Sequence, residues 1–254
     1  MKLFANDAPL PTAGYLAIKK MRTVSWFTLL TALFLGFRYV APAAEEDGVA
    51  LAIIYDTSGS MKDPVADKDG RTSPKYQIAN RALIAITKRI QTFATNNAGA
   101  TPRKIDAGLF VFDRNGAREV VKFGPFDPKA FERFAKTFAN PTGNTPLGNS
   151  LKTAGETVLA SPLPRKHVLV ITDGQNTAGP TPGAVLPKLN RQAEQQHAVL
   201  GVHFVAFDAD AHLFDSIKKQ GATVVGAADE TQLNSQLEYI LQRKILLEDE
   251  EPKK

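Results

Sequence analysis

Apolar runs alternate with amphipathic stretches along the chain from residue 48 onward. Residues 49–55 and 167–172 are mostly apolar, a pattern typical of strands that a parallel sheet buries on both faces. Residues 76–93 instead repeat their large apolar side chains at the spacing of an amphipathic helix. The same patterns predict further strands at 105–112, 118–123, 198–207 and 222–225, and further helices at 129–138, 147–159, 184–196, 213–219 and 230–246.

This order of elements predicts an α/β fold. The turn-forming sequence at 113–116 leaves no room for a crossover helix, so the strands at 105–112 and 118–123 must be antiparallel. Helices separate the other strands, which favours parallel pairing. We therefore expect a doubly wound, mostly parallel six-stranded sheet with one antiparallel edge strand, helices on both faces, no internal repeat and no second domain.

The first 43 residues have the pattern of a secretory leader. The basic residues Lys19, Lys20 and Arg22 precede an apolar run over 24–37, and the small residues at 41–43 suit cleavage by signal peptidase after the last of them. Because this run of 14 residues is shorter than the roughly 20 that span a bilayer, a cleaved signal is favoured over an uncleaved anchor.

The sequence therefore divides into a leader at 1–43, a single domain at 44–247 and a charged tail at 248–254. A true start at Met21 would leave a more compact leader. Since no second apolar run follows the leader, we expect no membrane span once it has been cleaved.

Composition removes several classes of function. The 254 residues are 43% hydrophobic and 22% charged, which is ordinary for a domain that buries a core. The formal charge is +5, but five basic groups and only one acid lie in residues 1–43. The rest holds 26 Lys and Arg against 25 Asp and Glu, so we expect no nucleic-acid partner. The absence of cysteine excludes disulfides, Cys-ligated metals and thiol catalysis.

Oxygen-bearing side chains stand where predicted elements end or begin. Asp56, Ser58 and Ser60 follow the first strand, Thr145 lies just before a helix, and Asp173 follows a second buried strand. In such sheets ligands bind beyond the carboxyl ends of the strands. Hard cations prefer oxygen ligands, and two carboxylates nearly neutralise a dication. The sequence therefore predicts a five-residue metal site whose small, hydroxyl-rich set favours Mg²⁺, with Mn²⁺ or Ca²⁺ as alternatives.

Each piece taken alone has an ordinary structural explanation. The pattern Asp-x-Ser-x-Ser is a common loop composition, Thr145 before Pro146 suits a helix cap, and Thr-Asp-Gly at 172–174 suits a turn. Their occurrence together and in this order, at strand ends and a helix entry of an α/β chain, favours the metal site.

At these residues the sequence resembles the von Willebrand factor A (VWA) domain family. The matching stretches are 53–61 (IIYDTSGSM), 143–147 (GNTPL) and 168–174 (VLVITDG), and the resemblance extends over residues 48–245. It implies the Rossmann-like VWA fold and a metal-ion-dependent adhesion site (MIDAS). Ser58 and Ser60 would then bind the metal directly, Asp56 usually through water, and Thr145 and Asp173 in either way, depending on whether ligand is bound.

The resemblance implies a binding module rather than an enzyme, with no catalytic residues. The metal would keep one position open for an Asp or Glu side chain of a partner protein. Candidate residues around that position are Lys62, Arg71, Asn144, Gln175 and Asn176. Asn144 departs from the glycine that many relatives have there, and the loop at 62–74 is longer than in compact relatives. With the leader, this predicts an exported, periplasmic or secreted module for adhesion or assembly.

Two other functions remain open. A Mg²⁺-dependent hydrolase on a similar sheet would use Asp56 as nucleophile, but it would need a second carboxylate where Ser58 stands. Ser58 also interrupts the Asp-Thr-Gly of aspartic proteases, and neither a Gly-x-Ser-x-Gly elbow nor a phosphate-binding glycine loop is present. The third possibility is a scaffold whose metal is purely structural.

Two further groups of polar residues favour structural roles. His167 and His203 fall in predicted strands, which favours buried positions over catalysis. Asp67 and Asp69 before Gly70 resemble part of a calcium loop. Because the acid run and closing Glu of an EF-hand are missing, we expect a solvated loop there.

Overall fold

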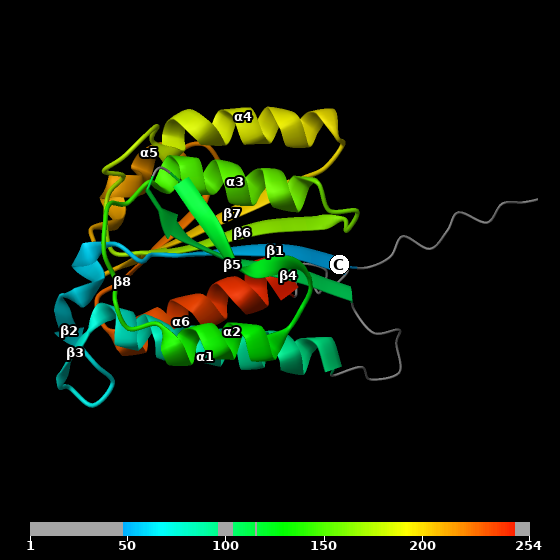
Figure 1. Ribbon diagram of the computed structural model, residues 1–254. Coiled ribbons are helices and arrows are strands. Elements are labelled where there is room, and N and C mark those ends of the chain that lie inside the picture. Colours follow the sequence, from blue (N-terminus) through cyan, green and yellow to red (C-terminus); the bar gives the residue numbers. More distant parts are fainter. Residues whose placement is uncertain (1–47, 96–103, 115, 247–254) are drawn as a thin grey trace, which may run out of the picture. The chain divides into compact units, whose positions relative to one another are not determined.

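The computed structural model describes residues 48–95, 104–114 and 116–246 (Figure 1). The predicted leader at 1–43 and tail at 248–254 lie outside these residues, so both stay predictions. Within the described part of the chain, no helix is both long and apolar enough to cross a membrane.

The main sheet has the predicted architecture. Its six strands are β1 (Gly48–Tyr55), β4 (Lys104–Asp113), β5 (Gly116–Pro125), β6 (Arg165–Thr172), β7 (Leu200–Phe207) and β8 (Thr223–Ala227). They lie in the order β5-β4-β1-β6-β7-β8, and only the edge strand β5 pairs in the antiparallel sense. The chain builds outward from β1 in both directions, so β1 stands at the point where the strand order reverses, the usual place for a ligand.

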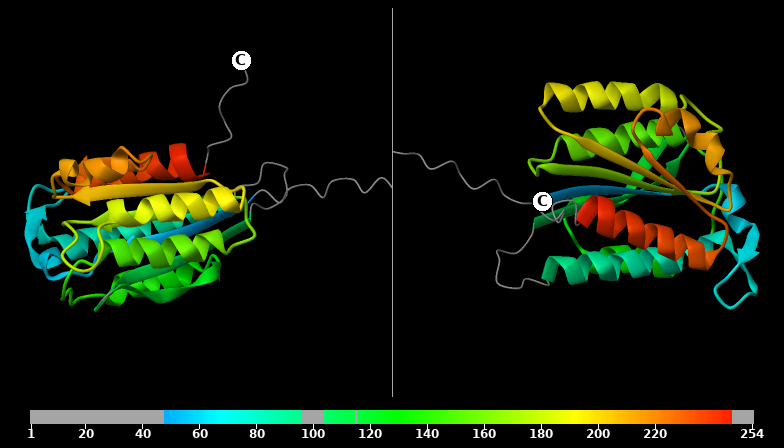
Figure 2. Two further views of the ribbon diagram at one scale, coloured as in Figure 1. Left: turned by 90° about the horizontal axis from the view of Figure 1, so that it is seen from above. Right: turned by 180° about the vertical axis from the view of Figure 1, so that it is seen from behind.

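Helices cover both faces of the sheet, as Figures 1 and 2 show. One face carries α3 (Leu147–Leu159), α4 (Pro182–Gln195) and α5 (Asp215–Lys218), and the other carries α1 (Lys75–Thr95), α2 (Pro128–Thr137) and α6 (Glu230–Ile240). Side-chain caps fix two of these starts: Asp127 accepts hydrogen bonds from the first turn of α2, and Asp229 does so for α6.

Two helices differ from their predicted form. The helix predicted at 213–219 is a 3₁₀ turn, Ala211–Phe214, followed by the short α5. The closing helix ends its α-helical part at Ile240 and continues as a π-helical segment, Leu241–Leu246. Leu241, Ile245 and Leu246 are buried in that segment, so the wider turn keeps the apolar residues of the last turns against the sheet.

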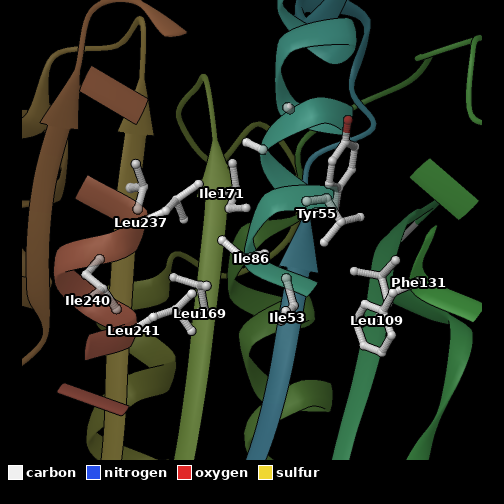
Figure 3. Close-up of a cluster of buried hydrophobic side chains, with 14 of the residues drawn as sticks. Ile53, Tyr55, Ile86, Leu109, Phe131, Leu169, Ile171, Leu237, Ile240 and Leu241 are labelled. Atoms are coloured by element: carbon white, nitrogen blue, oxygen red, sulfur yellow. The ribbon is translucent and has the colours of Figure 1, made fainter. Parts of the chain in front are cut away.

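The core holds β1 rigidly. All eight residues of β1 are buried, and alternate side chains enter opposite layers. Ile53 and Tyr55 pack with Leu109, Ile171 and Leu237 in the cluster under α1 and α6 (Figure 3). The residues of β1 that alternate with them belong to the cluster under α3 and α4. The chain therefore leaves β1 at a well-determined point, and Asp56 is the next residue.

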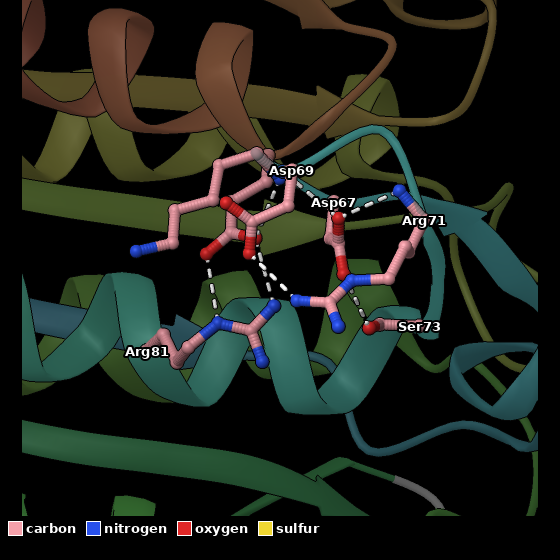
Figure 4. Close-up of polar contacts among 7 residues, drawn as sticks. Asp67, Asp69, Arg71, Ser73 and Arg81 are labelled. Carbon is pink, nitrogen blue, oxygen red and sulfur yellow. Dashed lines mark hydrogen bonds and ion pairs between the residues drawn. The ribbon is translucent and has the colours of Figure 1, made fainter.

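The segment predicted as a loop at 62–74 contains a small hairpin. After a 3₁₀ turn at Gly59–Lys62, strands β2 (Pro64–Ala66) and β3 (Thr72–Pro74) pair antiparallel. The carboxylate of Asp67 organises its turn by accepting hydrogen bonds from the backbone N–H of Asp69 and Arg71 and from the Ser73 hydroxyl (Figure 4). A side chain that bonds nearby backbone in this way builds a turn that no apolar pattern reveals.

Glu230 fastens this hairpin to the domain. Its buried carboxylate accepts two hydrogen bonds from the Arg81 guanidinium, at 2.8 and 2.7 Å, and one from the backbone N–H of Lys68 at 3.1 Å. The hydrogen bonds from Arg81 and Lys68 lower the pKa of Glu230 and outweigh the effect of burial. The tip of the hairpin is thus tied to the start of α6, close in sequence to the end of β8.

Candidate metal centre

Two of the predicted site residues follow neighbouring parallel strands. Asp56 comes directly after β1 and Asp173 directly after β6, and these two strands pair in parallel over nearly their whole length. The backbone N–H of Asp56 donates to the carbonyl of Ile171 at 3.0 Å, which continues the ladder past the last residue of β1. Both carboxylates therefore lie at the same edge of the sheet, as the sequence predicts.

Ser58 and Ser60 join this pair through a chain of oxygen atoms. The Oγ atoms of Ser58 and Ser60 are 3.1 Å apart, and Ser60 Oγ donates to Asp173 Oδ1 at 2.8 Å. Residues 58 and 60 thus turn their hydroxyls toward the same point. Thr57, between Asp56 and Ser58, turns away, and its hydroxyl lies 3.4 Å from the carbonyl oxygen of Phe112.

Asp56 is fully buried behind these hydroxyls. Its Oδ1 accepts from the backbone N–H of Ser58 at 2.7 Å, and its Oδ2 accepts from the Thr172 hydroxyl at 2.6 Å. Burial first, and then the negative charge of Asp173, raise the pKa of Asp56 to about 6, although hydrogen bonds from Ser58 and Thr172 oppose the rise. A carboxylate in this position is stabilised by a cation and destabilised without one.

Thr145 arrives on a loop that backbone hydrogen bonds attach to both strand ends. The carbonyl of Gly143 accepts from the N–H of Gly59, and the N–H and carbonyl of Thr145 bond to the hydroxyl and N–H of Thr177. Gly143 has a φ of +91°, a conformation that side-chain-bearing residues rarely adopt. Thr145 is 4% exposed. The loop therefore brings the fifth predicted residue to the same edge as the other four.

A lysine that the sequence did not single out adds a positive charge beside Asp173. Lys75 Nζ lies 3.2 Å from Asp173 Oδ2 and 2.9 Å from Asp208 Oδ2, just beyond β7. Burial lowers the pKa of Lys75, but the hydrogen bonds and charges of Asp208 and Asp173 outweigh it and hold that pKa above its ordinary value. Nothing in the local sequence marks Lys75, because its partners come from distant strands.

The comparisons with known proteins agree with this architecture. The family model of the von Willebrand factor type A domain matches residues 50–239. The chain belongs to this family. A comparison with the sequences of curated proteins found no match.

Several solved structures share the VWA fold with this chain. The PilB minor pilin from Streptococcus sanguinis is 17% identical over 80% of this chain and 62% of its own, with a TM-score of 0.58. The vWF domain of the type V pili tip protein Mfa5 from Porphyromonas gingivalis is 11% identical over 79% and 95%, with a TM-score of 0.51. Proximal thread matrix protein 1 from the mussel byssus, in a structure with a zinc-occupied MIDAS motif, is 15% identical over 78% and 48%, with a TM-score of 0.54.

These similarities show the fold alone, because all three identities are low. This chain spans 62% of the PilB pilin and 48% of the byssal protein. What the complete proteins do therefore does not follow for this VWA domain from the likeness.

The donor set of this VWA domain fits a hard cation. The oxygens that come together belong to two carboxylates and to hydroxyls, and among the described residues no three His, Cys, Asp or Glu side chains form a cluster that could hold a metal. A soft metal that needs several nitrogen or sulfur ligands would find none of them here, whereas Mg²⁺ or a similar ion would be held by oxygen and retained water.

The residues predicted around the open position have different environments. Lys62, Asn144 and Gln175 are exposed. Arg71 is exposed too and pairs with Asp69 on the hairpin. Asn176 instead has a structural role, because its Oδ1 accepts from the N–H of Gly148 and its Nδ2 donates to the carbonyl of Gly179.

A depression of about 340 Å³ lies beside Asn144. It is lined by Phe112, Asp113, Arg114, Thr142, Gly143 and Asn144. The loop that carries Thr145 thus forms one wall of this depression, and the turn after β4 forms the other.

His167 and His203 lie away from this edge. They occupy the early parts of β6 and β7, where His167 Nδ1 and His203 Nε2 are 3.2 Å apart and the rings stack. Burial lowers the pKa of His167 to about 3 and that of His203 to about 4. Both rings are therefore neutral core groups at ordinary pH.

Proposed function

We propose that this chain is an exported, metal-dependent protein-binding module for adhesion or assembly. Its VWA domain would hold Mg²⁺, or alternatively Mn²⁺ or Ca²⁺, with Asp56, Ser58, Ser60, Thr145 and Asp173. The bound cation would capture an Asp or Glu side chain of a partner protein. The observation that supports this most is the continuous chain of oxygens from Ser58 through Ser60 to Asp173, with the buried Asp56 behind it.

The charges of the site favour an anionic ligand. Asp56 already accepts a hydrogen bond at each oxygen, so it serves mainly as a buried negative charge that reaches a cation through water. The hydroxyls of Ser58 and Ser60 can bind a cation without adding charge. A hard cation held by so few direct carboxylates remains electron-poor, and a carboxylate is the ligand that it prefers in an open position.

Export is supported by the predicted leader and by the nature of the similar structures. Two of these belong to pilus proteins and one to a byssal thread matrix protein. The leader pattern at 1–43 agrees with such a place outside the cytoplasm, and the domain would begin after it at residue 44.

The metal can be tested by isothermal titration calorimetry of the full chain with Mg²⁺. Ser58→Ala should weaken Mg²⁺ binding at least about tenfold, because loss of one positioned ligand commonly costs that much or more. Ser235→Ala, an exposed position on α6, is the matched control and should bind as the wild type does. Equal affinity of Ser58→Ala and wild type would refute the assigned ligands.

Capture of a partner can be tested by pull-down from an exported fraction. Binding should be present in Mg²⁺, absent in EDTA, and lost in Asp173→Ala. A chain that gains thermal stability from Mg²⁺ yet captures the same proteins in EDTA would be a scaffold with a structural metal. Phosphatase or protease turnover that requires Asp56 would instead favour a hydrolase.

A further inference from the structure

A buried ammonium group lies between the candidate metal site and the neighbouring strand. Lys75 is only 5% exposed, and its Nζ contacts Oδ2 of both Asp173 and Asp208. The other oxygen of Asp173 accepts the hydrogen bond from Ser60. One carboxylate therefore faces hydroxyls on one side and a cation of the protein itself on the other.

Neither the burial of Lys75 nor its place in the helix favours a cation. It is the first residue of α1, where the helix carries partial positive charge, and the first turn contains no acidic residue. Removing an ammonium from water also costs free energy unless opposite charges replace the lost solvation. The carboxylates of Asp173 and Asp208 provide that replacement, so the lysine and the two acids stabilise one another.

We infer that Lys75 is a tethered counter-cation of the metal site, which stabilises the metal-free protein and competes with the divalent ion for the charge of Asp173. This inference rests on the proposed function and concerns what sets the metal affinity of that same site. Asp208 has the complementary role, because it keeps a partner for Lys75 when Asp173 turns to the metal.

The local charges give the direction of the effect. Asp56, Asp173 and Asp208 carry three negative charges and Lys75 one positive charge, so a dication brings the group to neutrality. Replacing Lys75 by an uncharged residue would leave a stronger negative field for the metal to enter. If an uncharged residue replaced Asp208, Lys75 would pair more closely with Asp173, and metal binding would weaken.

The test is calorimetric titration of the full chain with Mg²⁺. Lys75→Met should lower the Kd by at least about tenfold, because even well-screened repulsion between a monovalent and a divalent cation a few ångströms apart is worth that much. Asp208→Asn should raise the Kd. Asp208 has a left-handed backbone (φ +50°), which Asn also adopts, so this variant keeps the local conformation.

Lys129→Met is the matched control. It removes the same charge from an exposed lysine in the first turn of α2, where solvent and salt screen it, so its Kd should stay near that of the wild type. A second readout is the melting temperature. Lys75→Met should melt below the wild type in EDTA and show the larger rise on addition of Mg²⁺.

The outcomes separate this inference from the proposed function. If the wild type binds Mg²⁺ and Lys75→Met binds it equally well or more weakly, the inference is overturned and the proposed function stands. Failure of both proteins to bind Mg²⁺ would overturn both, whereas binding by Lys75→Met only would support the inference strongly. Should Lys75→Met not fold, Asp208→Asn decides, since unchanged or tighter binding by that variant contradicts the competition.

Discussion

The buried carboxylate of Asp56 makes the stability of the metal-free protein depend on pH in an unusual direction. Its pKa is about 6 in the fold, against an ordinary value of 3.8, because of burial and then the charge of Asp173. The folded state therefore keeps a proton that the unfolded chain releases between these two values. The stabilisation from this group is complete below about pH 4 and is lost as the pH rises through about 6.

The magnitude follows from the size of the shift. About two pKa units at about 1.4 kcal/mol each correspond to roughly 3 kcal/mol. Asp56→Asn provides the reference, because asparagine has nearly the same shape and does not titrate. In EDTA, the free energy of unfolding of the wild type minus that of Asp56→Asn should fall by roughly 3 kcal/mol between pH 4 and pH 7.

Urea unfolding of both proteins at half-unit steps of pH measures this difference directly. Groups far from Asp56 titrate alike in both proteins and cancel, so the remaining slope belongs to Asp56 and the charges coupled to it. In saturating Mg²⁺ the decline should disappear for the wild type, because a cation stabilises the charged carboxylate. A difference that stays constant from pH 4 to pH 7 in EDTA would show that Asp56 does not titrate as a buried, repelled carboxylate.

Two other predictions concern the loops that surround the site. Gly143→Ala should cost about 1 kcal/mol or more and should weaken Mg²⁺ binding without removing a ligand, because φ is +91° there. The control is Gly221→Ala, at a φ of +94°. It should lose a similar amount of stability, and calorimetric titration should show an unchanged affinity for Mg²⁺. Glu230→Gln should cost about 1 to 2 kcal/mol through its weakened bonds to the partly exposed Arg81, and limited proteolysis should cut the hairpin sooner. Glu238→Gln, at an exposed ion pair, should cost under about 1 kcal/mol and leave the hairpin intact.

The sequence predicted the centre of the sheet well because β1 and β6 are buried on both faces and are apolar through their central residues. The pattern at 49–55 and 167–172 marked β1 and β6, and the short turn after β4 marked the antiparallel edge. The neighbouring ends of β1 and β6 then brought Asp56 and Asp173 together, as parallel pairing requires.

Features that depend on contacts between distant side chains could not be predicted. Lys75 reaches Asp173 across 98 positions of sequence, and its place before an amphipathic helix looks like that of any surface lysine. The hairpin after Ser60 depends on hydrogen bonds that nearby backbone N–H groups donate to Asp67. It also depends on the hydrogen bond from the backbone N–H of Lys68 to Glu230, which lies 162 residues later in the chain. The sequence places Asn176 near the site but does not reveal its hydrogen bond to the start of α3.

The junction of β1 and β6 exists only in the native fold. Thr172 and Asp56, which bond across it, are 116 residues apart in the chain, so an unfolded polypeptide offers no comparable cluster of oxygens. A cation bound there is a ligand of the native state alone. Such a ligand adds about 2.7 kcal/mol of stability at a hundred times its Kd, and nothing where it is scarce. The lifetime of the folded domain would then depend on the concentration of divalent cations around it. Chelating media would shorten this lifetime, and cation-rich media would prolong it.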